Sequence, residues 1–124
     1  MTTPLAILYH EKILPGSQLV NRLQDLGYRV HTAPNAGSLA QEVAEKMPMV
    51  LVMDLESKGS DLPAVIQAIR KNPATAHVAI LAYAAAKQQR TQAAAREAGA
   101  TLVADEAGIL NQLPQLLEQA LVVE

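Results

Sequence analysis

Five short runs of apolar residues recur along the 124-residue chain and limit its fold more than any other feature. Four of these runs are almost continuously apolar: Leu5–Tyr9, Met49–Leu55, His77–Ala84 and Thr101–Ala104. The remaining run, Tyr28–Ala33, alternates apolar and polar residues. A continuously apolar strand is typical of a sheet covered on both faces, whereas an alternating strand is typical of an edge. The runs therefore predict a five-stranded sheet with Tyr28–Ala33 at an edge.

Segments in which apolar residues recur at helical spacing separate these runs, and they predict five helices. Residues that start or stop helices bound each segment. They are Gly27 after the first helix, Ser38, Gln41 and Pro48 around the second, Asp61 and Asn72 around the third, Gly99 after the fourth (88–98), and Asn111 as the cap of the last. Ser38 and Gln41 have the spacing of a capping box. Strands that alternate with such helices predict one α/β domain over residues 1–124, with a doubly wound five-stranded parallel sheet, (βα)5.

Composition excludes several classes of function. The chain has no cysteine, which excludes disulfides, thiolate metal sites and cysteine nucleophiles. Its 10 basic and 12 acidic residues give a net charge of −2 without a basic cluster, so nucleic-acid binding is not expected. No apolar run approaches the ~18 residues of a membrane span, and the N-terminus lacks the features of a signal peptide. We therefore expect a cytoplasmic domain that binds neither nucleic acid nor membranes.

Asp54 is the most informative polar residue, because it ends an otherwise apolar strand. Ligands of open α/β sheets bind beyond the carboxyl ends of the strands, so Asp54 is predicted to face the binding crevice. Glu11 follows the first strand, and we expect the two carboxylates to lie within a few ångströms of each other. Carboxylates that converge in this way repel each other unless a cation lies between them, and such oxygen ligands suit Mg²⁺. A surface carboxylate that merely ends a strand is the alternative interpretation of Asp54.

On these residues the whole chain resembles the receiver domain of two-component response regulators, as in the chemotaxis regulators. Asp54 stands at the family's phosphoacceptor position, His10-Glu11 at its acidic pair, and Ala98-Gly99-Ala100 at the turn before the fifth strand. The resemblance implies the flavodoxin-like receiver fold.

The resemblance also implies a set of Mg²⁺ ligands, namely Glu11, Asp54 and the backbone carbonyl of Glu56. His10 occupies the other acidic position and supplies no anionic oxygen, so we expect Mg²⁺ binding to be weak. No other cofactor is expected.

Departures from the family's pattern surround Asp54. Residues 82–84, at the end of the fourth strand, are Ala-Tyr-Ala, where the family has a serine or threonine. Ala104-Asp105 replaces the family's Lys-Pro after the fifth strand. A phosphoryl group on Asp54 would therefore lack a cationic contact and a hydroxyl donor.

The leading hypothesis is a stand-alone, degenerate receiver-like domain that acts by protein–protein interaction in bacterial two-component signalling and is not an enzyme. Its partners would be a sensor kinase or a downstream effector. We predict the partner surface on the face of the fourth helix, fifth strand and fifth helix, with contacts from Tyr83, Gln89, Arg90 and Arg96, because tyrosine and arginine often anchor interfaces. Homodimerisation through this face is a further prediction, and for Tyr83 the alternative role is to cover the edge of the fourth strand.

Two alternatives remain open. The first is a functional phosphoreceiver that accepts a phosphoryl group on Asp54 with Mg²⁺. The second, from a different class, is a small flavodoxin-like enzyme or cofactor-binding subunit that uses the same crevice. The absence of a glycine-rich phosphate loop argues against flavin binding.

Overall fold

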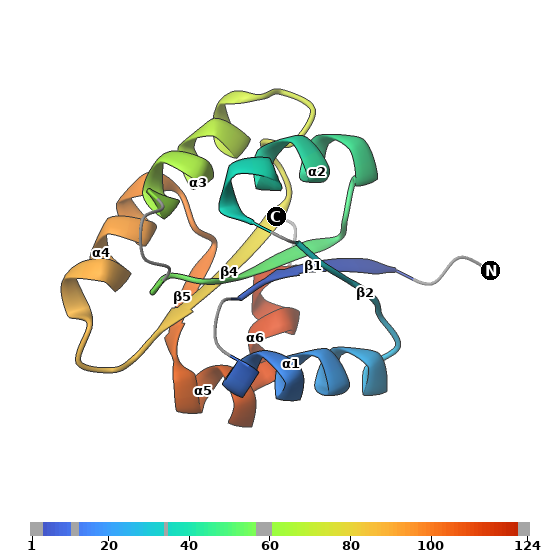
Figure 1. Ribbon diagram of the computed structural model, residues 1–124, viewed down its shortest axis with the longest axis vertical. Helices are drawn as coiled ribbons and strands as arrows, with labels where there is room; N and C mark the ends of the chain where they lie inside the picture. The colour runs from blue at the N-terminus through green and yellow to red at the C-terminus, as the bar shows by residue number, and fades with distance from the viewer. Residues whose placement is uncertain (1–3, 11–12, 34, 57–60, 122–124) are drawn as a thin grey trace.

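The computed structural model describes residues 4–10, 13–33, 35–56 and 61–121. Its strands are β1 (Leu5–Tyr9), β2 (Arg29–Thr32), β3 (Val50–Asp54), β4 (Ala79–Ala84) and β5 (Leu102–Asp105). Its helices are α1 (Ile13–Asp25), the short 3-10 helix η1 (Ala36–Ser38), α2 (Leu39–Lys46), α3 (Leu62–Lys71), α4 (Gln89–Ala98), α5 (Glu106–Asn111) and α6 (Leu113–Ala120). The strands are parallel and lie in the order β2-β1-β3-β4-β5, which confirms the predicted doubly wound α/β sheet (Figure 1).

Helices cover both faces of the sheet, with α2, α3 and α4 on one side and α1, α5 and α6 on the other (Figure 1). Because successive side chains of a strand point to opposite faces, each inner strand contributes to two apolar clusters. In β3, for example, Leu51 packs beneath α2 and α3, whereas Val52 packs beneath α1 and α6. This two-sided burial explains why the inner strands are almost continuously apolar.

The two edge strands differ in how well their sequences predict them. The alternating run Tyr28–Ala33 contains β2, which lies at one edge as expected. The run Thr101–Ala104 was expected to be buried on both faces, and this expectation is wrong. Its strand, β5, forms the other edge, and all four of its residues are half-buried. The inner position of β3 places Asp54 in the middle of the carboxyl edge of the sheet.

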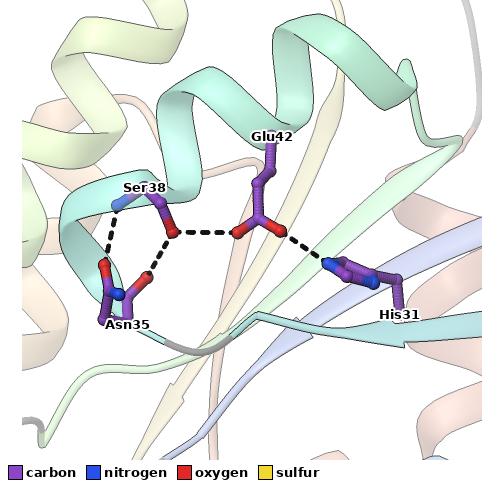
Figure 2. A network of polar contacts seen from close by, with 4 residues as sticks. All are labelled: His31, Asn35, Ser38 and Glu42. Carbon is purple, nitrogen blue, oxygen red and sulfur yellow. Dashed lines mark hydrogen bonds and ion pairs between the residues drawn. The ribbon is translucent and has the colours of Figure 1, made fainter.

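A network of polar contacts joins β2 to α2 and replaces the predicted capping box of Ser38 and Gln41 (Figure 2). The Ser38 hydroxyl donates to Glu42 Oε2 at 3.0 Å, and His31 Nε2 lies 2.6 Å from Glu42 Oε1. Asn35 Oδ1 accepts the backbone N–H of Ser38 at 3.0 Å. Burial would raise the pKa of Glu42, but hydrogen bonds from His31 and Ser38 and nearby positive charge together lower it. The network therefore fixes edge strand β2 against α2.

The last helical segment is two helices rather than one. Asp105 starts α5, because its Oδ1 accepts the backbone N–H of Gly108 at 2.6 Å. The sequence predicted Asn111 as the cap of a single helix, but Asn111 ends α5 and Gln112 precedes α6. Pro114 explains the break, because a proline ring clashes with the preceding helical turn and is tolerated only in the first turn of a new helix.

The ends of the other helices follow the sequence signals more closely. Asp61 caps α3 by accepting the N–H of Ala64 at 3.2 Å, and α3 ends before Asn72, as predicted. Gly99 follows α4 with φ of 121°, a conformation that favours glycine. The first helix begins at Ile13, earlier than its apolar pattern indicates, and Leu26 lies beyond its end with 43% of its surface exposed.

Candidate functional site

Asp54 is the last residue of β3 and is completely buried, with 0% of its surface exposed. Its Oδ1 accepts the backbone N–H of Glu56 at 2.9 Å. An aspartate that binds the backbone two residues further on stabilises the turn out of the strand. A buried carboxylate needs such donors, because leaving a charge unsatisfied in the interior is costly. This hydrogen bond helps to hold Asp54 in position at the end of β3, and the prediction that Asp54 faces a binding crevice stays a prediction.

Glu56 connects the end of β3 to the end of β4. Its Oε2 accepts the backbone N–H of Ala85 at 2.9 Å, across 29 residues of sequence. Nearby, the N–H of Leu55 donates to the carbonyl oxygen of Tyr83 at 2.9 Å and extends the pairing of the two strands. The sequence assigned Glu56 a role only through its backbone carbonyl. The structure shows that its side chain also holds the segment that follows β4.

Tyr83 is buried beside Asp54 and not on a partner surface. It pairs with Asp54 in the β3–β4 register, its exposed fraction is 0%, and it packs with Ile109 and Leu113 beneath α5 and α6. The expectation of a surface contact by Tyr83 is therefore wrong in this conformation, because β4 is an inner strand with both faces covered. Within the described part of the chain, the Tyr83 hydroxyl has no hydrogen-bond partner. Burial, followed by the charge of Asp54 and two glutamates, raises the pKa of Tyr83.

The carboxyl end of β5 carries no basic side chain. Ala104 pairs with Tyr83, and Asp105 pairs with Ala84. The carboxylate of Asp105 binds the first turn of α5. The ends of β3, β4 and β5 thus bring together Asp54, Ala84 and Asp105, which include neither a hydroxyl of serine or threonine nor a cation.

The predicted Mg²⁺ ligands are placed only in part. His10 follows β1 and is half-buried, whereas Glu11 lies outside the described residues, so the predicted approach of Glu11 to Asp54 stays a prediction. Across the described ranges, no group of three or more His, Asp or Glu side chains could hold a metal ion. His31 is bound to Glu42, as a structural rather than a metal-binding histidine. Of the predicted ligands, the Asp54 carboxylate and the Glu56 carbonyl lie within the described residues, and both are oxygen donors of the kind that Mg²⁺ takes together with water.

A groove of about 880 Å³ runs between α4 and the segment formed by β5, α5 and the start of α6. Its lining combines small and aliphatic residues with six polar side chains: Gln89, Gln92, Arg96, Asp105, Asn111 and Gln112. Of the predicted contact residues, Gln89 and Arg96 line the groove, and Arg90 is exposed on α4 outside it. The sequence did not predict that Gln92 and Asn111 also line the groove. The one sequence feature that could have indicated the groove is the alanine-rich composition of α4, because small side chains such as that of Ala93 leave space beside β5.

The helices seen in the described ranges include none that is both long enough and apolar enough to cross a membrane.

Comparison with known proteins finds similarity in structure but not in sequence families. No family model matches the chain, and no curated protein matches it in sequence. Among solved structures, the receiver domain of the sensor histidine kinase PA1611 from Pseudomonas aeruginosa has a TM-score of 0.85 at 18% identity, covering 97% of this chain and 98% of that one. That structure holds a magnesium ion in its active-site cleft.

Two further structures show the same similarity. A protein of Chloroflexus aurantiacus assigned as a response regulator has a TM-score of 0.87 at 21% identity, covering 97% of this chain and 98% of that one. The chemotaxis response regulator CheY4 of Vibrio cholerae has a TM-score of 0.76 at 18% identity, covering 93% and 99%. At these identities the similarity establishes the fold. The chain has the receiver fold that its sequence resemblance implies.

Proposed function

We propose that this chain is a receiver domain of two-component signalling that works by binding other proteins, with little dependence on phosphorylation. The observation that carries the proposal is the carboxyl edge of the sheet. In a receiver fold, this edge keeps the buried carboxylate of Asp54 but presents Ala84 and Asp105 at the neighbouring strand ends. The acceptor position is retained, and two groups that would stabilise a phosphoryl group are missing.

Charge explains why this edge disfavours a phosphoryl group. An aspartyl phosphate carries about two negative charges in place of the single charge of the carboxylate, and it is stable where cations and hydrogen-bond donors surround it. Here Asp54 is joined by Glu56, whose carboxylate binds the neighbouring segment, and by Asp105, whose carboxylate binds α5. We therefore expect a phosphorylated Asp54 to form slowly and to reach low occupancy.

The groove between α4 and α5 is the proposed partner surface. Its polar lining suits a sensor kinase or effector that presents polar side chains and hydrogen-bonding backbone, and Arg96 is its best anchor because arginine is enriched in interface hot spots. Self-association through the same face is part of the proposal. We place the protein in the cytoplasm, where such partners meet.

The proposal is tested by comparing chemistry at Asp54 with partner binding. The chain is incubated with acetyl phosphate and Mg²⁺, and the intact mass reports the phosphorylated fraction, with Asp54→Asn as the control. Binding to candidate sensor kinases and self-association are then measured by sedimentation. We expect Asp54→Asn to leave binding unchanged and Arg96→Ala to weaken it. Arg22→Ala, which alters an exposed arginine on α1, serves as the matched control.

A functional phosphoreceiver is the second candidate, and the fixed position of Asp54 at the end of the inner strand β3 favours it. Mg²⁺ would then be held by Asp54, the backbone carbonyl of Glu56 and Glu11, and it would neutralise charge at the acceptor. We expect binding only at millimolar Mg²⁺, and His10→Asp should tighten it, because carboxylate oxygen is the preferred ligand. Near-complete phosphorylation by acetyl phosphate, with partner binding that switches on treatment, would establish this candidate instead.

A further inference from the structure

A continuous set of hydrogen bonds leads from Asp54 to α4. Asp54 Oδ1 accepts the N–H of Glu56, and Glu56 Oε2 accepts the N–H of Ala85, both at 2.9 Å. The carbonyl oxygen of Ala85 accepts the N–H of Gln88 at 2.9 Å and Nε2 of Gln92 at 3.2 Å. Gln92 belongs to α4 and lines the groove. The set therefore joins the predicted acceptor to one wall of the proposed partner surface.

Ala85 is held on both sides of its backbone. Its N–H binds a carboxylate, and hydrogen bonds to a charged acceptor are stronger than those between neutral groups. Its carbonyl oxygen binds the turn at Gln88 and the side chain of Gln92, which fixes it to the start of α4. Because Ala85 directly follows β4, these bonds together determine where the segment between β4 and α4 lies.

We propose that Glu56 is the positioning residue that fixes the segment between β4 and α4, and with it the α4 wall of the groove, without any group added to Asp54. Because the Glu56 carboxylate belongs to the same chain, its effective concentration at the Ala85 N–H is high, and the hydrogen bond needs no added ligand. A ligand could move this segment only if it bound a displaced position of the segment more tightly than the position described here. The inference rests on the proposed function in one respect, namely that the groove is a partner site.

If Glu56 has this role, the position of the α4 wall of the groove does not depend on the negative charge of Asp54. The link between Asp54 and Glu56 uses the backbone N–H of Glu56, and an asparagine at position 54 keeps an oxygen that can accept it. Loss of the Asp54 charge should therefore leave the segment in place. Loss of the Glu56 carboxylate should release it, because nothing else described binds the Ala85 N–H.

The test is hydrogen exchange of backbone amides, measured by NMR on the full chain. Wild type is compared with Glu56→Ala, Glu56→Gln, Asp54→Asn and Glu118→Ala, the last being a matched loss of an exposed carboxylate on α6. We expect the Ala85 amide to exchange about tenfold faster in Glu56→Ala, since a hydrogen bond to a charged group is lost. Glu56→Gln should restore most of the protection, because its amide oxygen can accept the same bond. Asp54→Asn and Glu118→Ala should match wild type.

The outcomes separate this proposal from the proposed function. Unchanged exchange at Ala85 in Glu56→Ala, or equally fast exchange in Glu56→Ala and Glu56→Gln, would overturn the role of Glu56. Faster exchange at Ala85 in Asp54→Asn would overturn the independence from Asp54. If hydrogen exchange at Ala85 changes as expected while Glu56→Ala and Arg96→Ala both bind the partner as wild type does, the positioning role of Glu56 is supported. The same result would refute the groove as the partner site.

Discussion

Replacement of Tyr83 by phenylalanine should stabilise the protein. The Tyr83 side chain is completely buried, and its hydroxyl has no hydrogen-bond partner in the part of the chain that the structure describes. A buried polar group left unsatisfied costs about 1 to 3 kcal/mol, and Tyr83→Phe removes the hydroxyl while keeping the ring that fills the core. We expect a gain of about 1 kcal/mol, which for a domain of this size raises Tm by roughly 4 °C.

Urea unfolding followed by circular dichroism measures this gain. The midpoint should move to higher urea, and the slope m should not change, because the surface exposed on unfolding is nearly the same. Tyr28→Phe is the control, since Tyr28 is only half-buried, and its effect should stay within about 0.5 kcal/mol. A loss of stability in Tyr83→Phe would refute the reasoning, because it would mean that the hydroxyl has a partner in the folded protein.

The same substitution should change how stability depends on alkaline pH. Burial and the negative charges nearby raise the pKa of Tyr83 above its ordinary value of 10.0. Below this pH both the folded and the unfolded chain keep the phenol proton. Above it the unfolded chain releases the proton while the folded chain retains it, so unfolding is favoured as pH rises. Wild type should therefore lose stability above pH 10 more steeply than Tyr83→Phe.

Three further predictions concern the contacts that maintain the fold, and each is checked by equilibrium unfolding. Asp61→Ala should cost about 0.5 to 2 kcal/mol, because it removes the cap of α3, while Asp61→Asn should retain most of the stability. Arg70 donates to three backbone carbonyls and to the Thr101 hydroxyl, so Arg70→Lys should cost about 1 to 3 kcal/mol, because an ammonium group does not match the geometry of a guanidinium; equal stability would show that these bonds contribute nothing. The pKa of Glu42 is lowered from 4.5, so the stability that its ionised form provides is present above that pH and is lost as pH falls below it. Glu42→Gln should flatten this acid dependence, and an unchanged profile would count against the ion pair with His31.

Apolar patterning predicted the fold, because burial on two faces leaves a mark on each inner strand. The all-apolar run of β3 and the alternation of β2 are direct consequences of where each strand lies in the sheet. The same reasoning misplaced β5, since a short edge strand that packs beside α4 can be as apolar as an inner one. It also missed α5, whose six residues include Gly108 and carry too few apolar side chains to show a helical period.

The candidate site was predictable only where a residue's role follows from its place on a strand. Asp54 was singled out because an acidic residue ends an apolar strand, and the structure places it, completely buried, as the last residue of β3. The role of the Glu56 side chain could not be found in this way. Its bond to Ala85 joins residues 29 positions apart, and no periodicity or spacing in the sequence relates them. The burial of Tyr83 was missed for a similar reason, since a tyrosine at a strand end fits either the core or the surface.

Among the described residues, backbone amides donate to three acidic side chains at the carboxyl edge of the sheet. Asp54 binds the N–H of Glu56, the Glu56 carboxylate binds the N–H of Ala85, and Asp105 binds the N–H of Gly108. Backbone amides satisfy a carboxylate's hydrogen bonds but contribute only partial positive charge. A phosphoryl group on Asp54 would add charge where the amides are already engaged. This arrangement supports the proposal of a protein-binding domain whose surface is set by its own acidic side chains and not by phosphorylation.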